Sequence, residues 1–166
     1  MKKNYIGKIF SLESFEVNDG NVQAYSAIKN IVDKERKIYN PLFIYGDHGL
    51  GKTHLLKALI AENSKLKCKY ITVDNFLNTF TEHMQFQTMD LFRKEFLELD
   101  ILCIDDFESI VNKSATQEEL LNVITNLMNL DKVIVFSSSK SYTELSLLEK
   151  LSSVIQHGEV VEIKNS

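Results

Sequence analysis

Residues 46–53 read GDHGLGKT, between an apolar segment, LFIY at 42–45, and a helix-like segment, KTHLLKALIAEN at 52–63. The octapeptide matches G-x-x-x-x-G-K-[ST], the pattern of a phosphate-binding loop, in the strand-then-helix context that such a loop requires. Gly46, Gly49 and Gly51 allow the backbone to wrap around a phosphate with its N–H groups pointing inward. The dipole of the following helix favours an anion at the same point. These residues predict a nucleotide-phosphate site, and a glycine-rich turn before a helix is the alternative interpretation.

The last two residues of this loop carry the side chains expected to contact a nucleotide and its metal. Lys52 is expected to reach the β- and γ-phosphates, and the hydroxyl of Thr53 to bind Mg²⁺. A second segment, ILCIDD at residues 101–106, is an apolar strand that ends in two carboxylates. An acidic residue at the end of a strand beside the loop suits indirect Mg²⁺ ligation. We therefore assign Asp105 to the metal and Asp106, as the catalytic residue, to the attacking water.

The residues around this carboxylate pair have less specific patterns. Asp100 and Glu108 flank the pair, and we expect both to be solvated. The segment VIVFSSSKS, residues 133–141, predicts a strand that ends in serines at positions 137–139. A polar side chain there suits contact with the γ-phosphate or its water, but a run of serines after a strand is equally typical of a helix-capping turn.

Alternating strand and helix patterns predict an α/β fold with one parallel sheet and right-handed crossovers. Short apolar runs, three of them nearly continuous, predict strands at Leu42–Tyr45, Cys68–Val73, Ile101–Ile104, Lys132–Phe136 and Glu159–Ile163. Helices are predicted at Asn21–Lys34, with Asn21 as its cap, and at Lys52–Asn63, Asn75–Met84, Met89–Leu97, Thr116–Leu130 and Tyr142–Ile155. The polar interval Glu108–Glu118 is expected to form a loop over the active face.

The composition indicates an ordinary globular protein rather than a free-standing DNA binder. The chain has 166 residues, with 19 basic and 23 acidic side chains and a formal net charge of −4. That length suits one domain, residues 1–166, in which residues 1–9 are expected to form a flexible N-terminal segment. Cys68 and Cys103 are expected to be buried free thiols. Since the sequence contains neither a signal peptide nor an apolar run long enough for a membrane span, we expect a cytoplasmic protein.

Several segments resemble the AAA+ domain of the bacterial replication initiator DnaA family. They are FSLESFEVNDGNVQAYSA, YNPLFIYGDHGLGKTHLLKAL, KYITVDNF, DLFRKEFLELDILCIDDFE with the following TQEEL, and VIVFSSSKSYTEL. The resemblance extends from about Phe10 to Gly158. It does not include the family's N-terminal interaction domain, helical lid or C-terminal DNA-binding domain, and in this the chain is closer to shorter regulators such as the Hda type.

The resemblance implies a P-loop αβα sandwich whose five parallel strands follow the order 5-1-4-3-2. It implies ATP or ADP with Mg²⁺ as the cofactors, and DnaA or another replication protein as the partner. Adenine is expected to lie against the segment Phe15–Asn21. The nucleotide-binding residues are then Gly46, Gly49, Leu50, Gly51, Lys52, Thr53, His54, Asp105 and Ser139, and the metal ligands are Thr53 and Asp105.

The chain departs from the family pattern at positions that support hydrolysis. Val154 and Ser152 stand where the family has arginines, one of which reaches the γ-phosphate of a neighbouring subunit. Lys150 keeps a charge without the planar guanidinium fork. Ser139 replaces the family's sensor aspartate, and the sensor arginine of the lid has no counterpart. Because an arginine finger contributes roughly 10³–10⁵ in turnover, we expect slow ATP hydrolysis or none.

The family's paired helices that help to hold single-stranded DNA correspond here to FTEHMQFQTMDLFRKEF. Gln85 and Thr88 occupy basic positions of the family pattern, so Arg93 and Lys94 are the nearby charges. Phe86 suits stacking on a base, although an apolar residue between helices is more often part of a core. Single-strand binding is therefore expected to be weak.

Three functions remain open on this sequence. The first is an ATP-binding, DnaA-related factor that regulates replication initiation through protein contacts, for example by ending a growing DnaA filament. The second is an active ATPase of the helicase-loader type, such as DnaC. The third is a truncated DnaA-like core without independent activity. Oligomeric state is not predicted by any of these patterns.

Overall fold

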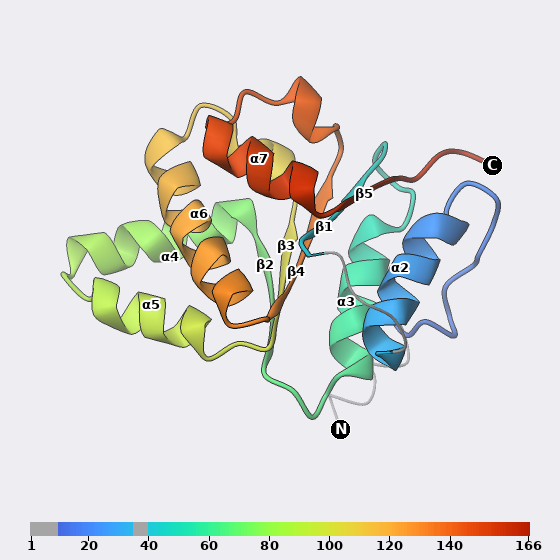
Figure 1. Ribbon diagram of the computed structural model, residues 1–166, viewed down its shortest axis with the longest axis horizontal. Helices are drawn as coiled ribbons and strands as arrows, with labels where there is room; N and C mark the ends of the chain where they lie inside the picture. Colours follow the sequence, from blue (N-terminus) through green and yellow to red (C-terminus); the bar gives the residue numbers. More distant parts are fainter. Residues whose placement is uncertain (1–9, 35–39) are drawn as a thin grey trace.

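The computed structural model describes residues 10–34 and 40–166, so the expectation for residues 1–9 lies outside the described part. Within it, five strands form one parallel sheet in the order β2-β3-β4-β1-β5, as the family resemblance implied (Figure 1). The strands are β1 (Leu42–Tyr45), β2 (Cys68–Thr72), β3 (Ile101–Asp105), β4 (Val133–Ser138) and β5 (Glu159–Glu162). The predicted α/β class and strand order are confirmed.

Helices cover both faces of this sheet, which gives the αβα sandwich (Figure 1). Their bounds are α2 (Val22–Asp33), α3 (Lys52–Glu62), α4 (Val73–Gln85), α5 (Met89–Leu97), α6 (Ser114–Asn129) and α7 (Glu149–His157), with 3₁₀ helices η1 (Phe107–Ile110) and η2 (Tyr142–Glu144). The pair α2 and α3 packs on one face, and α4 to α7 pack on the other. Among the described residues, no helix is both long enough and apolar enough to cross a membrane.

The two-residue period of the strands directs particular side chains to the α3 face. In β3, Ile101 and Cys103 belong to the core under α2 and α3, whereas Leu102 and Ile104 belong to the opposite core. Because successive side chains of a strand point to opposite faces, Asp105 follows Cys103 toward α3. The same alternation in β4 directs Ser137 to that side, two residues after Val135.

Three of the predicted segments differ from the observed ones for local reasons. Val73 was expected to end β2 but begins α4, because the Thr72 hydroxyl accepts a hydrogen bond from the Asn75 N–H and caps the helix. The interval Glu108–Glu118 is not a loop throughout, since it contains most of η1 and the first turn of α6. The predicted helix Tyr142–Ile155 is divided into η2 and α7.

Two expectations about single residues are also corrected. Asn21 precedes α2, but its side chain makes no cap bond there. Its amide instead donates to the Glu16 carbonyl and accepts from the Asn18 N–H, at 2.9 and 2.8 Å, which ties the preceding segment together. Of the two free cysteines, Cys103 is buried as predicted, whereas Cys68 is only half-buried at the edge strand β2.

Candidate phosphate-binding site

The loop between β1 and α3 has the backbone that its glycines predicted. Gly51 precedes α3 with φ of +94°, a conformation that side chains other than glycine rarely adopt. A Cβ atom there would also lie 2.8 Å from Cε2 of Phe15. At the other end of the loop, a Cβ on Gly46 would lie 2.5 Å from the Ile163 carbonyl oxygen. Sterics therefore require glycine at both ends of the loop.

Lys52 lies across this loop in the structure. Its Nζ donates hydrogen bonds to the carbonyl oxygens of Gly46 and Asp47, the latter at 2.6 Å. Burial lowers the pKa of the Lys52 amine, and the Glu108 carboxylate contributes most among the acidic groups that oppose this shift. The amine is a hydrogen-bond donor at the start of α3. The first N–H groups of that helix lack intrahelical acceptors, so they are further donors at the same point.

Asp105 is the most heavily hydrogen-bonded acid of the site. Its carboxylate is only 2% exposed and accepts a 2.7 Å hydrogen bond from the Thr53 hydroxyl. The hydroxyls of Tyr70 and Ser137 also donate to it, and so does the Asp106 N–H, at 3.1 Å. Burial opposes the charge of this carboxylate, but the three hydroxyls hold its pKa below the usual value. Asp105 is therefore an ionised acceptor at neutral pH.

Asp106 has a contrasting environment. It is exposed, and its backbone is left-handed, with φ of 54° and ψ of 44°. The strained turn is held by its N–H, which donates to Asp105 Oδ1 and, at 3.2 Å, to Ser137 Oγ. Although the residue is exposed overall, partial loss of water around its carboxyl group, together with the carboxylates of Asp105 and Glu108, raises the pKa of Asp106. A raised pKa is the direction expected of a group that accepts a proton.

These residues surround one cavity of about 280 Å³. It is lined by His48, Gly49, Gly51, Lys52, Thr53, Asp105, Asp106, Glu108, Ser137 and Ser138. The predicted loop residues Lys52 and Thr53 are thus brought together with both predicted carboxylates. Oxygen ligands from Thr53 and Asp105, adjacent in space, suit a Mg²⁺ ion that keeps most of its waters.

Four of the predicted nucleotide-binding residues do not line this cavity. Gly46, Leu50 and Ser139 line a neighbouring cavity of about 480 Å³, between the carboxyl ends of β1, β4 and β5. The His54 ring points to the N-terminal segment, where Nε2 lies 2.9 Å from the Ser11 carbonyl oxygen and the ring meets Phe15 edge-on. The expected contribution of His54 to nucleotide binding is thereby limited to its backbone N–H.

The two acids that were expected to be solvated are only partly exposed. Asp100 accepts from the Lys67 N–H and pairs with Lys132 at 2.9 Å, and these contacts hold its pKa below the usual value. Glu108 lines the cavity, and its Oε2 is buried. Its position follows from η1, which turns the chain back toward the loop directly after β3.

Tyr70 is the site residue that sequence reasoning missed. It lies on β2 and belongs to no recognised motif. The parallel register places Tyr70 beside Cys103, which shares the α3 face with Asp105, so the phenol can reach that carboxylate. A polar tip on an otherwise apolar strand face was the available signal.

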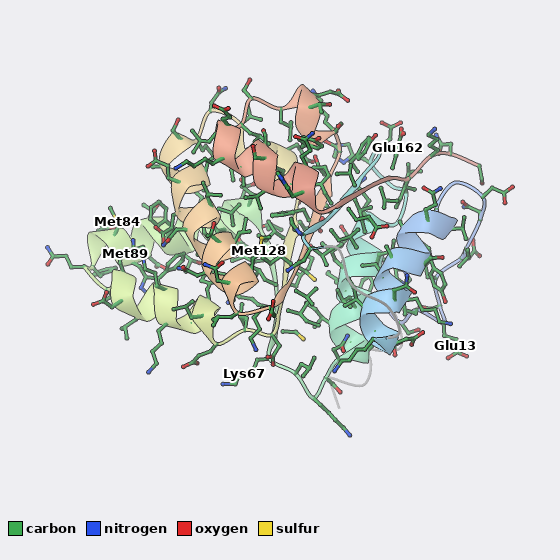
Figure 2. All side chains as sticks on the ribbon, in the orientation of Figure 1. Glu13, Lys67, Met84, Met89, Met128 and Glu162 are labelled. Atoms are coloured by element: carbon green, nitrogen blue, oxygen red, sulfur yellow. The ribbon has the colours of Figure 1, made fainter. Side chains whose placement is uncertain are left out.

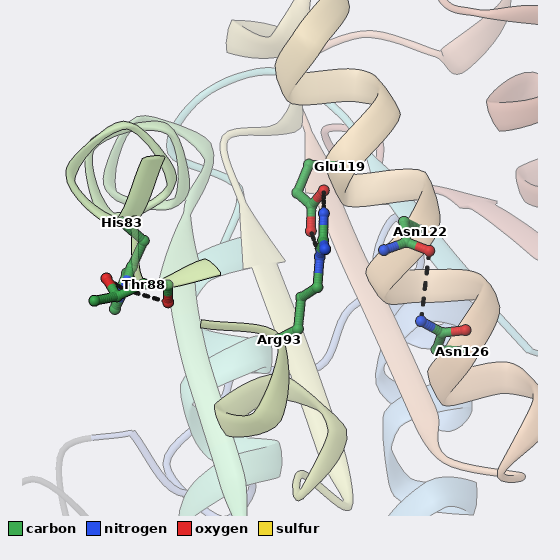
Figure 3. A network of polar contacts seen from close by, with 6 residues as sticks. All are labelled: His83, Thr88, Arg93, Glu119, Asn122 and Asn126. Atoms are coloured by element: carbon green, nitrogen blue, oxygen red, sulfur yellow. Dashed lines mark hydrogen bonds and ion pairs between the residues drawn. The ribbon is translucent and has the colours of Figure 1, made fainter. Parts of the chain in front are cut away.

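A second region of interest is the hairpin of α4 and α5, at the edge of the molecule (Figure 1). Met84, Phe86 and Leu91 are 56%, 70% and 61% exposed, and Figure 2 shows Met84 at its outer end. The possibility that Phe86 belongs to a core is therefore wrong. Arg93, expected as a nearby charge, donates two hydrogen bonds to the carboxylate of Glu119 on α6, at 3.1 and 3.2 Å (Figure 3).

The fold and the loop define the chain as a P-loop nucleotide-binding protein of the αβα class. A family model described as the bacterial DnaA ATPase domain matches residues 6–162. The chain is 42% identical, over 154 residues, to the chromosomal replication initiator protein DnaA of Streptococcus mutans serotype c. The chain therefore belongs to the bacterial DnaA ATPase domain family, as its motifs implied.

Solved structures agree with this assignment. A structure of the replication initiator DnaA bound to AMPPCP and single-stranded DNA is 34% identical, with a TM-score of 0.91 over 95% of this chain and 50% of that one. Domain III of the Thermotoga maritima replication initiation protein DnaA is 36% identical, with a TM-score of 0.88 over 94% of this chain and 67% of that one. The match to the Streptococcus mutans relative covers 89% of this chain but 34% of the relative.

Proposed function

We propose that this chain binds ATP and ADP with Mg²⁺ at the 46–53 loop, and acts in the cytoplasm in the initiation or regulation of DNA replication. The observation that carries the proposal is the Thr53 hydroxyl, 2.7 Å from the Asp105 carboxylate and one residue after Lys52. Mg²⁺ would be held by these two oxygen groups and would neutralise charge on the β- and γ-phosphates. Lys52 would exchange its loop carbonyls for phosphate oxygens.

The adenine is proposed to lie near the segment Phe15–Asn21. The segment lies beside the loop, because Phe15 packs against Gly51. Its other end is held to the residues after β5 by the Lys164 N–H, which donates to the Gly20 carbonyl at 3.0 Å. The solved relative that carries AMPPCP supports a nucleoside triphosphate as the ligand class.

We further propose that hydrolysis is weak and that protein contacts carry the function. On α7, Val154 and Ser152 replace family arginines, and neither side chain carries a positive charge that could stabilise a neighbour's γ-phosphate. A chain that accepts a partner's arginine without supplying one would end a directional filament of DnaA-like subunits. A helicase-loader-type ATPase and a core without independent activity remain the alternatives.

A weak contact with single-stranded DNA at the α4–α5 hairpin is a further part of the proposal. The 70% exposed Phe86 ring is available for stacking on a base. Since Arg93 is engaged by Glu119, the exposed Lys94 is the better candidate for a phosphate contact. The solved relative bound to single-stranded DNA supports this ligand class.

Calorimetric titration with ATP and ADP, together with turnover measured with and without full-length DnaA, tests this proposal. We expect nucleotide binding that Lys52→Ala weakens by about 100-fold, because phosphate oxygens lose a charge-assisted donor. Lys65→Ala, which removes an exposed lysine just beyond α3, is the matched control and should bind as the parent does. Turnover that requires Asp106 and needs no partner would favour the loader-type ATPase, and absence of binding would favour an inactive core.

A further inference from the structure

Glu108 has an unusual position in the phosphate cavity. It lies in η1, three residues after Asp105, and lines the cavity together with Lys52 and Thr53. Its Oε2 is buried, and within the described part of the chain it has no hydrogen-bond partner. A carboxylate oxygen removed from water without a donor is costly, and native structures rarely retain one without a reason.

The charges around the cavity are unbalanced. Three carboxylates line it, those of Asp105, Asp106 and Glu108, whereas Lys52 is the single lysine or arginine among the described lining residues. Asp105 is compensated by its hydroxyl donors, and Asp106 is exposed to water. Glu108 is the acid that is neither solvated at Oε2 nor paired, and no ion pair with Lys52 forms among the described residues.

A nucleotide that entered this cavity alone would add phosphate charge to the existing negative charge. A divalent cation that accompanies the phosphates would reverse this balance. Mg²⁺ also brings tightly held waters, whose O–H groups are the donors that a buried carboxylate oxygen lacks. The same carboxylate would then disfavour the metal-free nucleotide and favour the metal complex.

We propose that Glu108 is the positioning residue that makes nucleotide binding depend on Mg²⁺, by repelling metal-free phosphates and accepting a hydrogen bond at Oε2 from water held by the ion. The inference rests on the proposed nucleotide-binding function. It assigns to Glu108 a role distinct from that of Thr53 and Asp105, which hold the ion. It also separates Glu108 from Asp106, which acts on the attacking water.

Calorimetric titration of the full chain with ATP, once with excess Mg²⁺ and once with EDTA, tests the proposal without relying on turnover. For the parent chain we expect much weaker binding in EDTA. Glu108→Gln, which keeps the shape and removes the charge, should reduce the ratio of the two dissociation constants by about tenfold, mainly by strengthening binding in EDTA. Glu108→Asp, which keeps the charge, should retain most of the ratio.

The matched control is Glu118→Gln, which removes the same charge from an exposed position on α6 and should leave the ratio unchanged. Thermal melting of each nucleotide-free variant verifies folding. An unchanged ratio in Glu108→Gln overturns this inference and leaves the proposed function intact, even if turnover falls, since Glu108 would then act on the attacking water. Absence of ATP binding by the parent chain in both conditions overturns the proposed function and this inference together.

Discussion

The phosphate cavity and the α4–α5 hairpin depart from ordinary burial in opposite directions. At the carboxyl end of β3, a charged side chain, Asp105, is 2% exposed, whereas at the hairpin an aromatic one, Phe86, is 70% exposed. The buried charge is stabilised by hydroxyl donors from three separate elements. The exposed ring has no such compensation within the described fold. Buried polar groups and exposed apolar groups are the informative exceptions in a globular protein, and here both mark candidate contact sites.

The difference teaches that the two regions should respond differently to substitution. Removing the Asp105 carboxylate from the cavity leaves buried donors without an acceptor, so the free energy of unfolding should change together with ligand binding. Removing an exposed, unpaired group from the hairpin should change binding alone. Substitutions at the two regions, compared by chemical denaturation and by ligand titration, test this distinction.

The largest effect on stability is expected for Asp105→Asn. The amide accepts weakly where the carboxylate accepted from three hydroxyls, so the free energy of unfolding should fall by about 2 kcal/mol. Denaturation in urea measures this change. The adjacent Asp106→Asn is the matched control, and its nucleotide-free form should be as stable as the parent at pH 7 or slightly more so, because its pKa is raised. Equal losses in both variants would contradict the contrast between the two carboxylates.

The pH dependence of the same variants sharpens this prediction. Because the folded-state pKa of Asp105 is lowered, the stability from its ionisation is fully present above the unfolded-state pKa of about 3.9, and is lost as pH falls through the lower folded-state value. The difference between the parent and Asp105→Asn should therefore shrink below about pH 4. A difference that grows on acidification would show that the sign is wrong.

A smaller effect is expected for Arg93→Ala at the base of the hairpin. Its guanidinium pairs with Glu119, whose side chain is 9% exposed, although the Arg93 side chain itself is 47% exposed. Because solvent screens the Arg93 side of the pair, the free energy of unfolding should fall by roughly 1–2 kcal/mol, less than for a fully buried pair. Lys94→Ala, next to it and exposed, should cost little. If the two variants unfold at the same urea concentration, the Arg93–Glu119 pair does not fix α5 to α6.

The smallest effect on stability is expected for Phe86→Ala. An exposed ring contributes little packing, so the free energy of unfolding should remain within about 0.5 kcal/mol of the parent. Affinity for a fluorescent single-stranded oligonucleotide should fall, because base stacking on an aromatic ring is worth about 1–3 kcal/mol per base. Phe80→Ala, which removes a ring packed against the core, should show the reverse pattern of lost stability. Unchanged oligonucleotide affinity in Phe86→Ala would argue against a nucleic-acid contact at this position.

Much of the fold followed from local patterns. Four of the five predicted strands overlap the observed ones within one residue at each end, because short apolar runs between helical segments are characteristic of a buried parallel sheet. The errors occurred where a single hydrogen bond decided a boundary, as at Thr72, or where two short helices replaced one, as at Tyr142–Ile155. Neither event changes the hydrophobic period from which the prediction was made.

The sequence by itself determined the loop, the strand order through its family, and the assignment of Lys52, Thr53, Asp105 and Asp106 to one site. The strand order follows from the family resemblance, whereas the loop and the site follow from the glycine and lysine spacing and from two carboxylates at the end of an apolar strand. Only the tertiary structure decided that Tyr70 supports Asp105, that Glu108 enters the cavity unpaired, and that Arg93 is engaged by Glu119. The physical reason is that the Tyr70–Asp105 and Arg93–Glu119 contacts join residues 35 and 26 positions apart, and that the position of Glu108 depends on the η1 turn. Burial and pairing of a charge are properties of the packed chain, and no local pattern encodes them.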